Sequence, residues 1–239
     1  MSTFVLVHGA YHGAWCWHKL TPELRARGHD VVAFDLPAHG TDTTPVDAVS
    51  FSDYVDRIQT AIEAHGDSVV LVGHSMAGMV ITQAAERCHE EIDALVYLSA
   101  YLPPDDESMI DQRIEGSLVS RSFTVDEKRG VGIVDSDRIE ELFYADCSDS
   151  DVALARSLLR PEPIEPLTVP ISITPERFGS IPRAYVCCEN DRAITFEQQQ
   201  QMIVDRGCDV ELRLETSHSP FFSAPEETAG TLTKAAENV

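Results

Sequence analysis

Short apolar runs alternate with helix-length amphipathic stretches over the first hundred residues of the chain. The runs at 3–7, 30–35, 68–72 and 92–100 are rich in Val, Leu, Ile and Phe. Continuous apolar runs of this length are typical of strands that are buried on both faces of a parallel sheet. Residues 51–65 repeat apolar side chains at helical spacing instead, and either Ser50 or Ser52 can cap this helix. The alternation predicts a parallel sheet with helices on both faces.

The same alternation returns near the end of the chain. Residues 182–188 and 208–214 predict a fifth and a sixth strand. A helix is expected from Thr195 to Arg206, with Thr195 as its N-cap and Gln198 completing a capping box. The predicted fold class is therefore α/β, with a mainly parallel, twisted sheet of about six strands.

Residues 103–179 interrupt the pattern. This stretch is acidic and proline-rich, and it has helix-like pieces at 138–144 and 150–159 but no sheet rhythm. A stretch of this length is too long for a loop inside a compact domain. We therefore expect an inserted, mostly helical cap (lid) subdomain on a core of residues 1–102 and 180–239. A long peripheral helical excursion is the alternative.

The third predicted strand runs directly into a turn centred on a serine. The sequence Gly-His-Ser-Met-Ala-Gly places Ser75 at the centre of this turn, and a helix-compatible segment begins at Met76. Strand, sharp turn and helix in this order are typical of a nucleophile elbow, with small residues two before and two after the serine. Gly73 and Ala77 are small enough, although the consensus residue at the second position is glycine. A structural serine in a tight turn is the alternative.

Other polar residues follow the last two predicted strands. Asp191 comes after the fifth strand and His218 after the sixth, so both are expected where the carboxyl ends of the strands meet. A serine hydroxyl needs a base to take its proton, and the base needs a carboxylate to orient it. The order Ser75, Asp191, His218 matches the hydrolase triad on this type of sheet. Glu189 competes with Asp191 for the role of the acid, and a loop position is the alternative for His218.

Acyl transfer also requires donors for an oxyanion hole. The turn supplies the backbone N–H of Met76, and the loop after the first strand supplies a second N–H, for which Ala10 is the candidate. Gly9 gives this loop the freedom to approach the serine. Two further polar residues near strand ends are expected to be structural: Asp35, which holds the loop that follows it, and His39, which lies within that loop.

Together these motifs resemble the α/β-hydrolase superfamily. The resemblance rests on residues 7–17, 35–40, 73–78, 189–194 and 217–222, which occur in family order along nearly the whole chain. The branch it indicates holds plant methyl esterases, hydroxynitrile lyases and bacterial esterases similar to pyrethroid hydrolases.

The resemblance implies specific roles for the candidate residues. Ser75 would be the nucleophile, His218 the base and Asp191 the acid, with Ala10 and Met76 as oxyanion-hole donors under a cap that encloses an apolar pocket. Several large cap residues are candidates for lining this pocket or for forming the cap's own core: Met109, Phe123, Leu142, Phe143 and Tyr144.

Two departures from the lyase pattern affect the expected reaction. Ser219 stands directly after the histidine, where the lyases carry a lysine, and Gly9 stands where they carry a threonine. Both differences favour a serine carboxylesterase that hydrolyses small to medium apolar carboxylic esters through an acyl-enzyme on Ser75. The alternatives are a hydroxynitrile lyase-like or other carbon–carbon-cleaving enzyme, and a receptor-like member that only binds a ligand.

Composition limits the partners. The net charge of −22, from 40 acidic and 18 basic residues, argues against binding nucleic acid or an anionic membrane. No apolar run approaches the roughly 20 residues of a membrane span, and the N-terminus has no signal-peptide pattern, so a cytoplasmic location is expected.

The six cysteines have no C-x-x-C spacing. We expect free thiols, no metal site and no cofactor. The expected partner is a small-molecule ester substrate. The oligomeric state stays open, and a homodimer is possible because similar proteins are often dimers.

Overall fold

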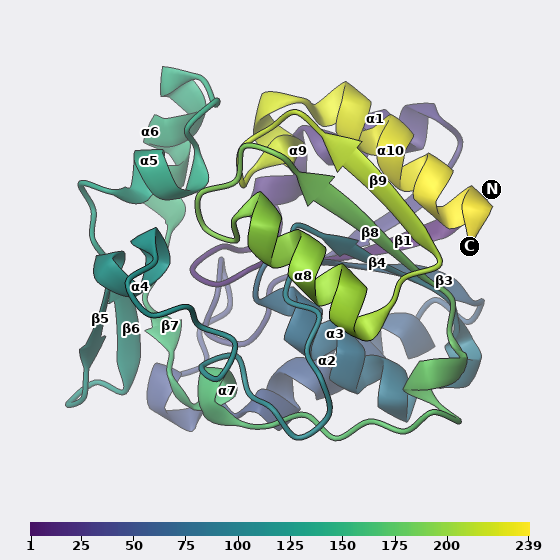
Figure 1. Cartoon of the computed structure of the whole chain (residues 1–239), viewed down its shortest axis with the longest axis horizontal. Coiled ribbons are helices and arrows are strands. Elements are labelled where there is room, and N and C mark those ends of the chain that lie inside the picture. The colour runs from purple at the N-terminus through teal and green to yellow at the C-terminus, as the bar shows by residue number, and fades with distance from the viewer.

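Six parallel strands form the central sheet of the computed structural model, which describes residues 1–239 (Figure 1). Their order across the sheet is β2-β1-β3-β4-β8-β9. The strands are β1 (Thr3–Val7), β2 (Asp30–Ala33), β3 (Val69–His74), β4 (Ile92–Leu98), β8 (Arg183–Cys188) and β9 (Val210–Leu214). All six were predicted from their apolar runs, and the observed ends lie within two residues of the predicted ones.

The middle strands are buried because helices cover both faces of the sheet. Every residue of β1 and β3 is buried, whereas the edge strand β9 alternates between partly buried and exposed residues until it ends at the buried Leu214. Gly73 of β3 pairs with Val7 of β1 and with Tyr97 of β4. This register brings the carboxyl ends of three central strands side by side, so the loops that follow them meet at one edge.

Five helices flank the sheet and contribute to two hydrophobic clusters, one on each face. The helices are α1 (Leu20–Ala26), α2 (Phe51–Glu63), α3 (Ala77–Arg87), α8 (Phe196–Arg206) and α10 (Pro225–Asn238). Side chains from α2, α3 and α8 form one cluster, and side chains from α1 and α10 belong to the other. Figure 1 shows these two groups of helices on opposite sides of the strands.

Two helix starts test the predicted caps. Ser50 caps α2 in a capping box with Asp53. Thr195 caps α8 by accepting a hydrogen bond from the backbone N–H of Gln198, but the predicted capping box at this helix is wrong. A capping box requires the side chain of Gln198 to accept a hydrogen bond from the backbone N–H of Thr195. The side-chain amide of Gln198 instead turns to a neighbouring loop, where it donates to the carbonyl of Gln112 at 3.2 Å.

The segment between β4 and β8 contains both helices and strands. Its elements are α4 (Leu118–Ser122), β5 (Phe123–Asp126), β6 (Val131–Val134), α5 (Ile139–Phe143), α6 (Asp149–Leu158), β7 (Glu162–Pro163) and α7 (Glu165–Thr168). The helix-like pieces predicted from the sequence correspond to α5 and α6. The antiparallel sheet β5-β6-β7 was not predicted, because strands of two to four residues are too short to show an alternating pattern. The division into core and cap stays a prediction.

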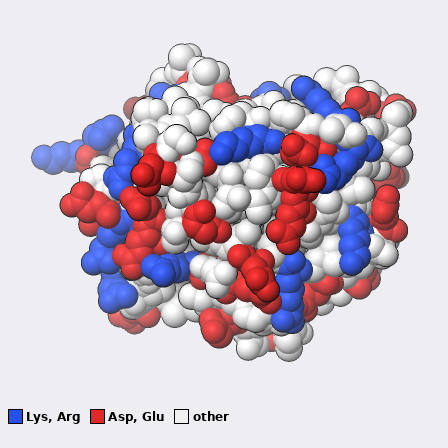
Figure 2. Space-filling model, turned by 90° about the horizontal axis from the view of Figure 1, so that it is seen from above, with Lys and Arg blue, Asp and Glu red and all other residues white.

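Short elements complete the fold. They are η1 (Ala14–His18), η2 (Val46–Ala48), η3 (His89–Glu91), η4 (Phe178–Ser180) and α9 (Pro220–Ser223). None of the helices combines the length and the apolar character needed to cross a bilayer. On the face seen in Figure 2, Lys and Arg lie among Asp and Glu and form no continuous basic surface.

Candidate active site

Ser75 lies in the tight turn between β3 and α3. Its φ angle is +56°, a left-handed conformation that is strained for a residue with a side chain. The carbonyl of Ser75 accepts hydrogen bonds from the backbone N–H groups of Gly78 and Tyr101, both at 3.1 Å. The first turn of α3 and the loop after β4 therefore hold the strained residue in place, as a nucleophile elbow requires.

The small residues around Ser75 are needed for different steric reasons. A Cβ atom at Gly73 would lie 2.8 Å from the side chain of Ile81 and 2.9 Å from the carbonyl of Ala77. A Cβ atom at Gly78 would collide with the carbonyl oxygen of Tyr101. The second close approach of this elbow is thus at Gly78, one residue after the consensus position, and this explains how the turn accommodates Ala77.

His218 and Asp191 form a buried pair at the ends of β9 and β8. The Nδ1 atom of His218 lies 2.6 Å from Oδ2 of Asp191, and the two residues are only 1% and 5% exposed. The other carboxylate oxygen of Asp191 accepts from the backbone N–H groups of Ala193 at 2.6 Å and Ile194 at 3.1 Å. The hydroxyl of Ser99 also donates to Oδ2. A carboxylate with four donors is fixed in orientation, and it fixes the imidazole in turn.

Glu189 is oriented away from this pair. Its carboxylate lies 3.6 Å from the guanidinium of Arg213. Of the two acids left open by the sequence, only Asp191 contacts His218.

His74 supports the backbone of His218 and was missed by the sequence analysis. Its Nε2–H donates to the carbonyl of His218 at 2.8 Å, and the two ring centroids are 4.5 Å apart. Burial, together with the nearby His218, lowers the pKa of His74 well below 6.5, so this ring stays neutral. The position of His74 directly before the serine was the only available signal, and it does not reveal a partner 144 residues away.

The loop after β1 packs directly against Ser75. A Cβ atom at Gly9 would lie 2.9 Å from Cβ of Ser75 and 3.1 Å from Nδ1 of His74, so only glycine permits this approach. The backbone N–H groups of Ala10 and Met76 donate to no other backbone group. Both N–H groups therefore have no acceptor within the backbone, and their role as oxyanion-hole donors stays a prediction.

His12 fixes this loop through a side-chain hydrogen bond. Its Nδ1–H donates to the carbonyl of Ala10 at 2.7 Å, which leaves Nε2 to accept from the hydroxyl of Tyr144 at 2.5 Å. Burial lowers the pKa of His12 to about 3, so the ring is neutral and keeps this tautomer. A segment between β4 and β8 is thereby connected to the loop that carries Ala10.

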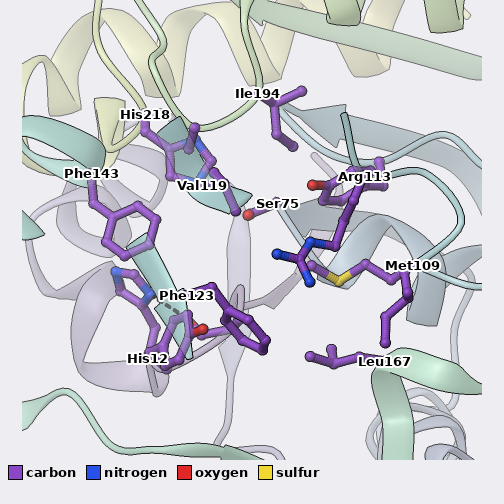
Figure 3. A pocket seen from close by; sticks show the side chains of 15 residues that line it. His12, Ser75, Met109, Arg113, Val119, Phe123, Phe143, Leu167, Ile194 and His218 are labelled. Atoms are coloured by element: carbon purple, nitrogen blue, oxygen red, sulfur yellow. Dashed lines mark hydrogen bonds between the residues drawn. The ribbon is translucent and has the colours of Figure 1, made fainter. Parts of the chain in front are cut away.

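Ser75 and His218 open into a pocket that is mostly apolar (Figure 3). Eleven of its 15 lining residues are hydrophobic. The lining is formed by Ala10, Tyr11, His12, Ser75, Tyr101, Met109, Ile110, Arg113, Val119, Phe123, Phe143, Leu167, Ala193, Ile194 and His218. Three of the five pocket candidates named from the sequence are in this set; the other two, Leu142 and Tyr144, are buried outside the lining.

Two residues expected to be structural make extensive hydrogen bonds outside the pocket. Asp35 accepts from the backbone of Ala14 at 2.7 Å and from the backbone and hydroxyl of Thr41 at 2.9 and 2.8 Å. His39 is fully buried, and its Nε2 lies 2.8 Å from the carboxylate of Glu162. Neither residue contacts the pair of His218 and Asp191.

The fold and the site together define an α/β hydrolase. The profile of the alpha/beta hydrolase family matches residues 4–231, and the chain belongs to this family. Methyl jasmonate esterase 1 of Vitis vinifera is 33% identical over 255 residues, which cover 98% of this chain and 97% of the relative. Salicylic acid-binding protein 2 of Nicotiana tabacum is 32% identical over 250 residues, with 98% and 96% covered. The crystal structure of polyneuridine aldehyde esterase matches with a TM-score of 0.89 at 30% identity over 98% of both chains.

These relatives confirm the branch that the sequence motifs indicated. The similarity extends over the whole chain, including the segment between β4 and β8.

Proposed function

We propose that the protein is a serine carboxylesterase that hydrolyses small to medium apolar carboxylic esters. The observation that carries this proposal is the buried pair of His218 and Asp191, which shares an apolar pocket with a serine on a strained elbow. The relatives named as methyl jasmonate esterase and polyneuridine aldehyde esterase support the same reaction class.

The proposed chemistry starts at the imidazole. Because Asp191 binds Nδ1 of His218, Nε2 is the nitrogen that takes the proton from Ser75 as its oxygen attacks the ester carbonyl. The imidazolium then protonates the leaving alcohol, and an acyl-enzyme remains on Ser75. In the second half of the reaction His218 activates water, which releases the acid.

The negative charge on the carbonyl oxygen needs donors during both halves. The N–H groups of Ala10 and Met76 are proposed to bind this oxygen. Gly9 supports this assignment because its lack of a side chain lets the loop reach the serine. His12 supports it because its bond to the carbonyl of Ala10 fixes the peptide that carries the donor.

Residues 103–179 are proposed to act as a cap over the core formed by 1–102 and 180–239. Seven pocket-lining residues come from this segment: Met109, Ile110, Arg113, Val119, Phe123, Phe143 and Leu167. Most are apolar and give the pocket hydrophobic surface, as an ester with an apolar acyl or alcohol group requires.

The thiols favour a reducing compartment for this activity. All six cysteines are free, and four of them are buried. We therefore propose a cytoplasmic location.

Hydrolysis of p-nitrophenyl butyrate by the wild type and by Ser75→Ala tests the proposed function. The variant should lose at least about 10³-fold in kcat, because the nucleophile is removed. Ser157→Ala is the matched control, since Ser157 is an exposed serine on α6 and should leave turnover unchanged. Equal rates for wild type and Ser75→Ala would exclude the acyl-enzyme mechanism. Release of aldehyde from mandelonitrile without ester turnover would instead favour the lyase.

A further inference from the structure

One pocket residue carries a permanent charge for which the proposed mechanism has no use. Four polar side chains lie among the apolar lining: His12, Ser75, Arg113 and His218. His12 is neutral and holds a loop, and Ser75 and His218 carry the proposed reaction. Arg113 is left without a role, and Figure 3 shows its guanidinium pointing into the pocket.

The guanidinium of Arg113 has no hydrogen-bond or ion-pair partner in the protein. It takes part in none of the ion pairs and donates no side-chain hydrogen bond, although the chain has 40 acidic residues. Guanidinium has five N–H donors in a planar fork, and this geometry matches a carboxylate. An unpaired fork in a mostly apolar pocket is therefore suited to bind an anionic group of a ligand.

Phe123 holds this guanidinium in place. The Cζ atom of Arg113 lies 4.8 Å from the centre of the Phe123 ring, in a cation–π contact. The ring of Phe123 packs against Gly132 of β6, where any side chain would collide with it. Because the aromatic ring covers one face of the guanidinium, the donors in the plane of the fork stay available. The antiparallel sheet of the cap thus orients a cation before a ligand arrives.

We propose that Arg113 binds an ionised carboxylate of the substrate, remote from the ester bond that is cleaved. The preferred substrates are then monoesters of aliphatic dicarboxylic acids, whose apolar spacer lies along the hydrophobic lining. This inference rests on the proposed esterase function. The overall charge of −22 repels such an anion, so that a local cation in the pocket is what makes its binding favourable.

Competition between a charged and a neutral ester tests the role of Arg113. The probes are monomethyl adipate, which carries one carboxylate, and dimethyl adipate, which carries none. For each enzyme the ratio of kcat/KM for the charged ester to that for the neutral ester is measured. The wild type should favour the charged ester, and Arg113→Met should lower the ratio by about tenfold or more, the usual effect of one charge-assisted hydrogen-bonded pair. Arg113→Lys should keep part of the preference, because it retains the charge and loses the fork.

Arg121→Met is the matched control. It removes the same charge from an exposed position on α4 and should leave the ratio unchanged. A wild type with no preference for the charged ester would overturn the proposal. A fall of equal size for both esters in Arg113→Met would also overturn it, since that result assigns Arg113 to packing alone.

A binding measurement separates this proposal from the esterase proposal. Calorimetric titration of Ser75→Ala with the two esters requires no turnover. Monomethyl adipate should bind about tenfold more tightly than dimethyl adipate, and the double variant Ser75→Ala/Arg113→Met should lose this difference. If the wild type hydrolyses neither ester but the binding preference is present, the esterase proposal fails and the carboxylate site stands. Equal affinities in Ser75→Ala exclude the carboxylate site whatever the turnover.

Discussion

Glu162 and His39 form a fully buried pair, with Oε2 and Nε2 2.8 Å apart. The same carboxylate accepts the backbone N–H of Tyr11 at 2.8 Å and the hydroxyl of Tyr54 at 3.1 Å. Glu162 lies on β7, so one side chain of the proposed cap joins the loop after β1, the loop after β2 and helix α2. Burial lowers the pKa of His39, but the charge and the hydrogen bond of Glu162 outweigh it and raise that pKa above 6.5.

Removing the counter-charge should destabilise the fold. Glu162→Gln leaves His39 without its anion and should lower the free energy of unfolding by about 3 to 5 kcal/mol, as measured by urea denaturation near pH 6. Glu176→Gln is the matched control, because Glu176 is exposed and makes no ion pair. If both variants unfold at the same urea concentration, the pair of Glu162 and His39 does not contribute to the free energy of unfolding.

The pair also predicts how stability depends on pH. Because the folded pKa of His39 is raised, its contribution is complete below about pH 6.5 and is lost as the pH rises through the folded value. His39→Gln should therefore show a flatter decline in the free energy of unfolding above pH 6.5 than the wild type. Parallel curves for the two proteins in this range would contradict the assignment.

Tyr144 is expected to act on catalysis through His12. Tyr144→Phe leaves the buried Nε2 of His12 unpaired, at a cost of about 1 to 3 kcal/mol, and loosens the loop that presents the N–H of Ala10. We expect both a lower melting temperature and a several-fold lower kcat. The loss in kcat should not exceed the loss caused by weakening one oxyanion-hole donor.

Tyr97→Phe is the control for this effect. Its hydroxyl is buried against Thr82 at 2.7 Å, away from the loop. It should lose comparable stability while kcat stays unchanged. An equal fall of kcat in both variants would assign the effect of Tyr144→Phe to general destabilisation.

The two small residues after Ser75 should respond differently to substitution. Gly78→Ala forces a methyl group against the carbonyl of Tyr101, which should cost about 1 to 3 kcal/mol of stability and displace the turn that carries the serine. Ala77→Gly restores the consensus spacing and should keep both kcat and the melting temperature near the wild-type values. Activity assays on p-nitrophenyl butyrate together with thermal unfolding decide this, and an active, stable Gly78→Ala enzyme would contradict the steric argument.

Asp191 and Glu189 can be distinguished directly. Asp191→Asn should reduce kcat by about 10³- to 10⁴-fold with little effect on KM, because the imidazole loses the anion that orients it and stabilises its charged form. Glu189→Gln removes an equal charge two residues away, where the side chain faces Arg213, and should leave kcat unchanged. The reverse pattern would transfer the role of the acid to Glu189.

The sheet and the residues at its carboxyl edge could be predicted because each depends on local pattern. The apolar run of β3 and the turn at Ser75 adjoin in sequence, and parallel topology then brings Asp191 and His218 to the same edge. Because the strands are parallel, the loops after them meet at one edge of the sheet, and this can be predicted without knowledge of side-chain contacts.

The partners that hold the site could not be predicted, since they depend on pairs far apart in the chain. Glu162 is 123 residues from His39, and Tyr144 is 132 residues from His12. Arg113 shows the same limit, because its position over Phe123 depends on the short antiparallel sheet whose strands have no detectable alternation. No local pattern specifies which loop a single glutamate, tyrosine or arginine will reach.

The loop that follows Asp191 combines two tasks, and this limits how substrate range can change. Ala193 and Ile194 donate their backbone N–H groups to Asp191, and the same residues line the pocket. A substitution there that enlarges the pocket also disturbs the orientation of the acid. Met109 and Leu167 line the same pocket but give no hydrogen bond to Asp191, so variation at these positions can alter the accepted substrate while the proposed triad keeps its geometry. Divergence and redesign of specificity in this enzyme should therefore proceed through residues 103–179, the proposed cap.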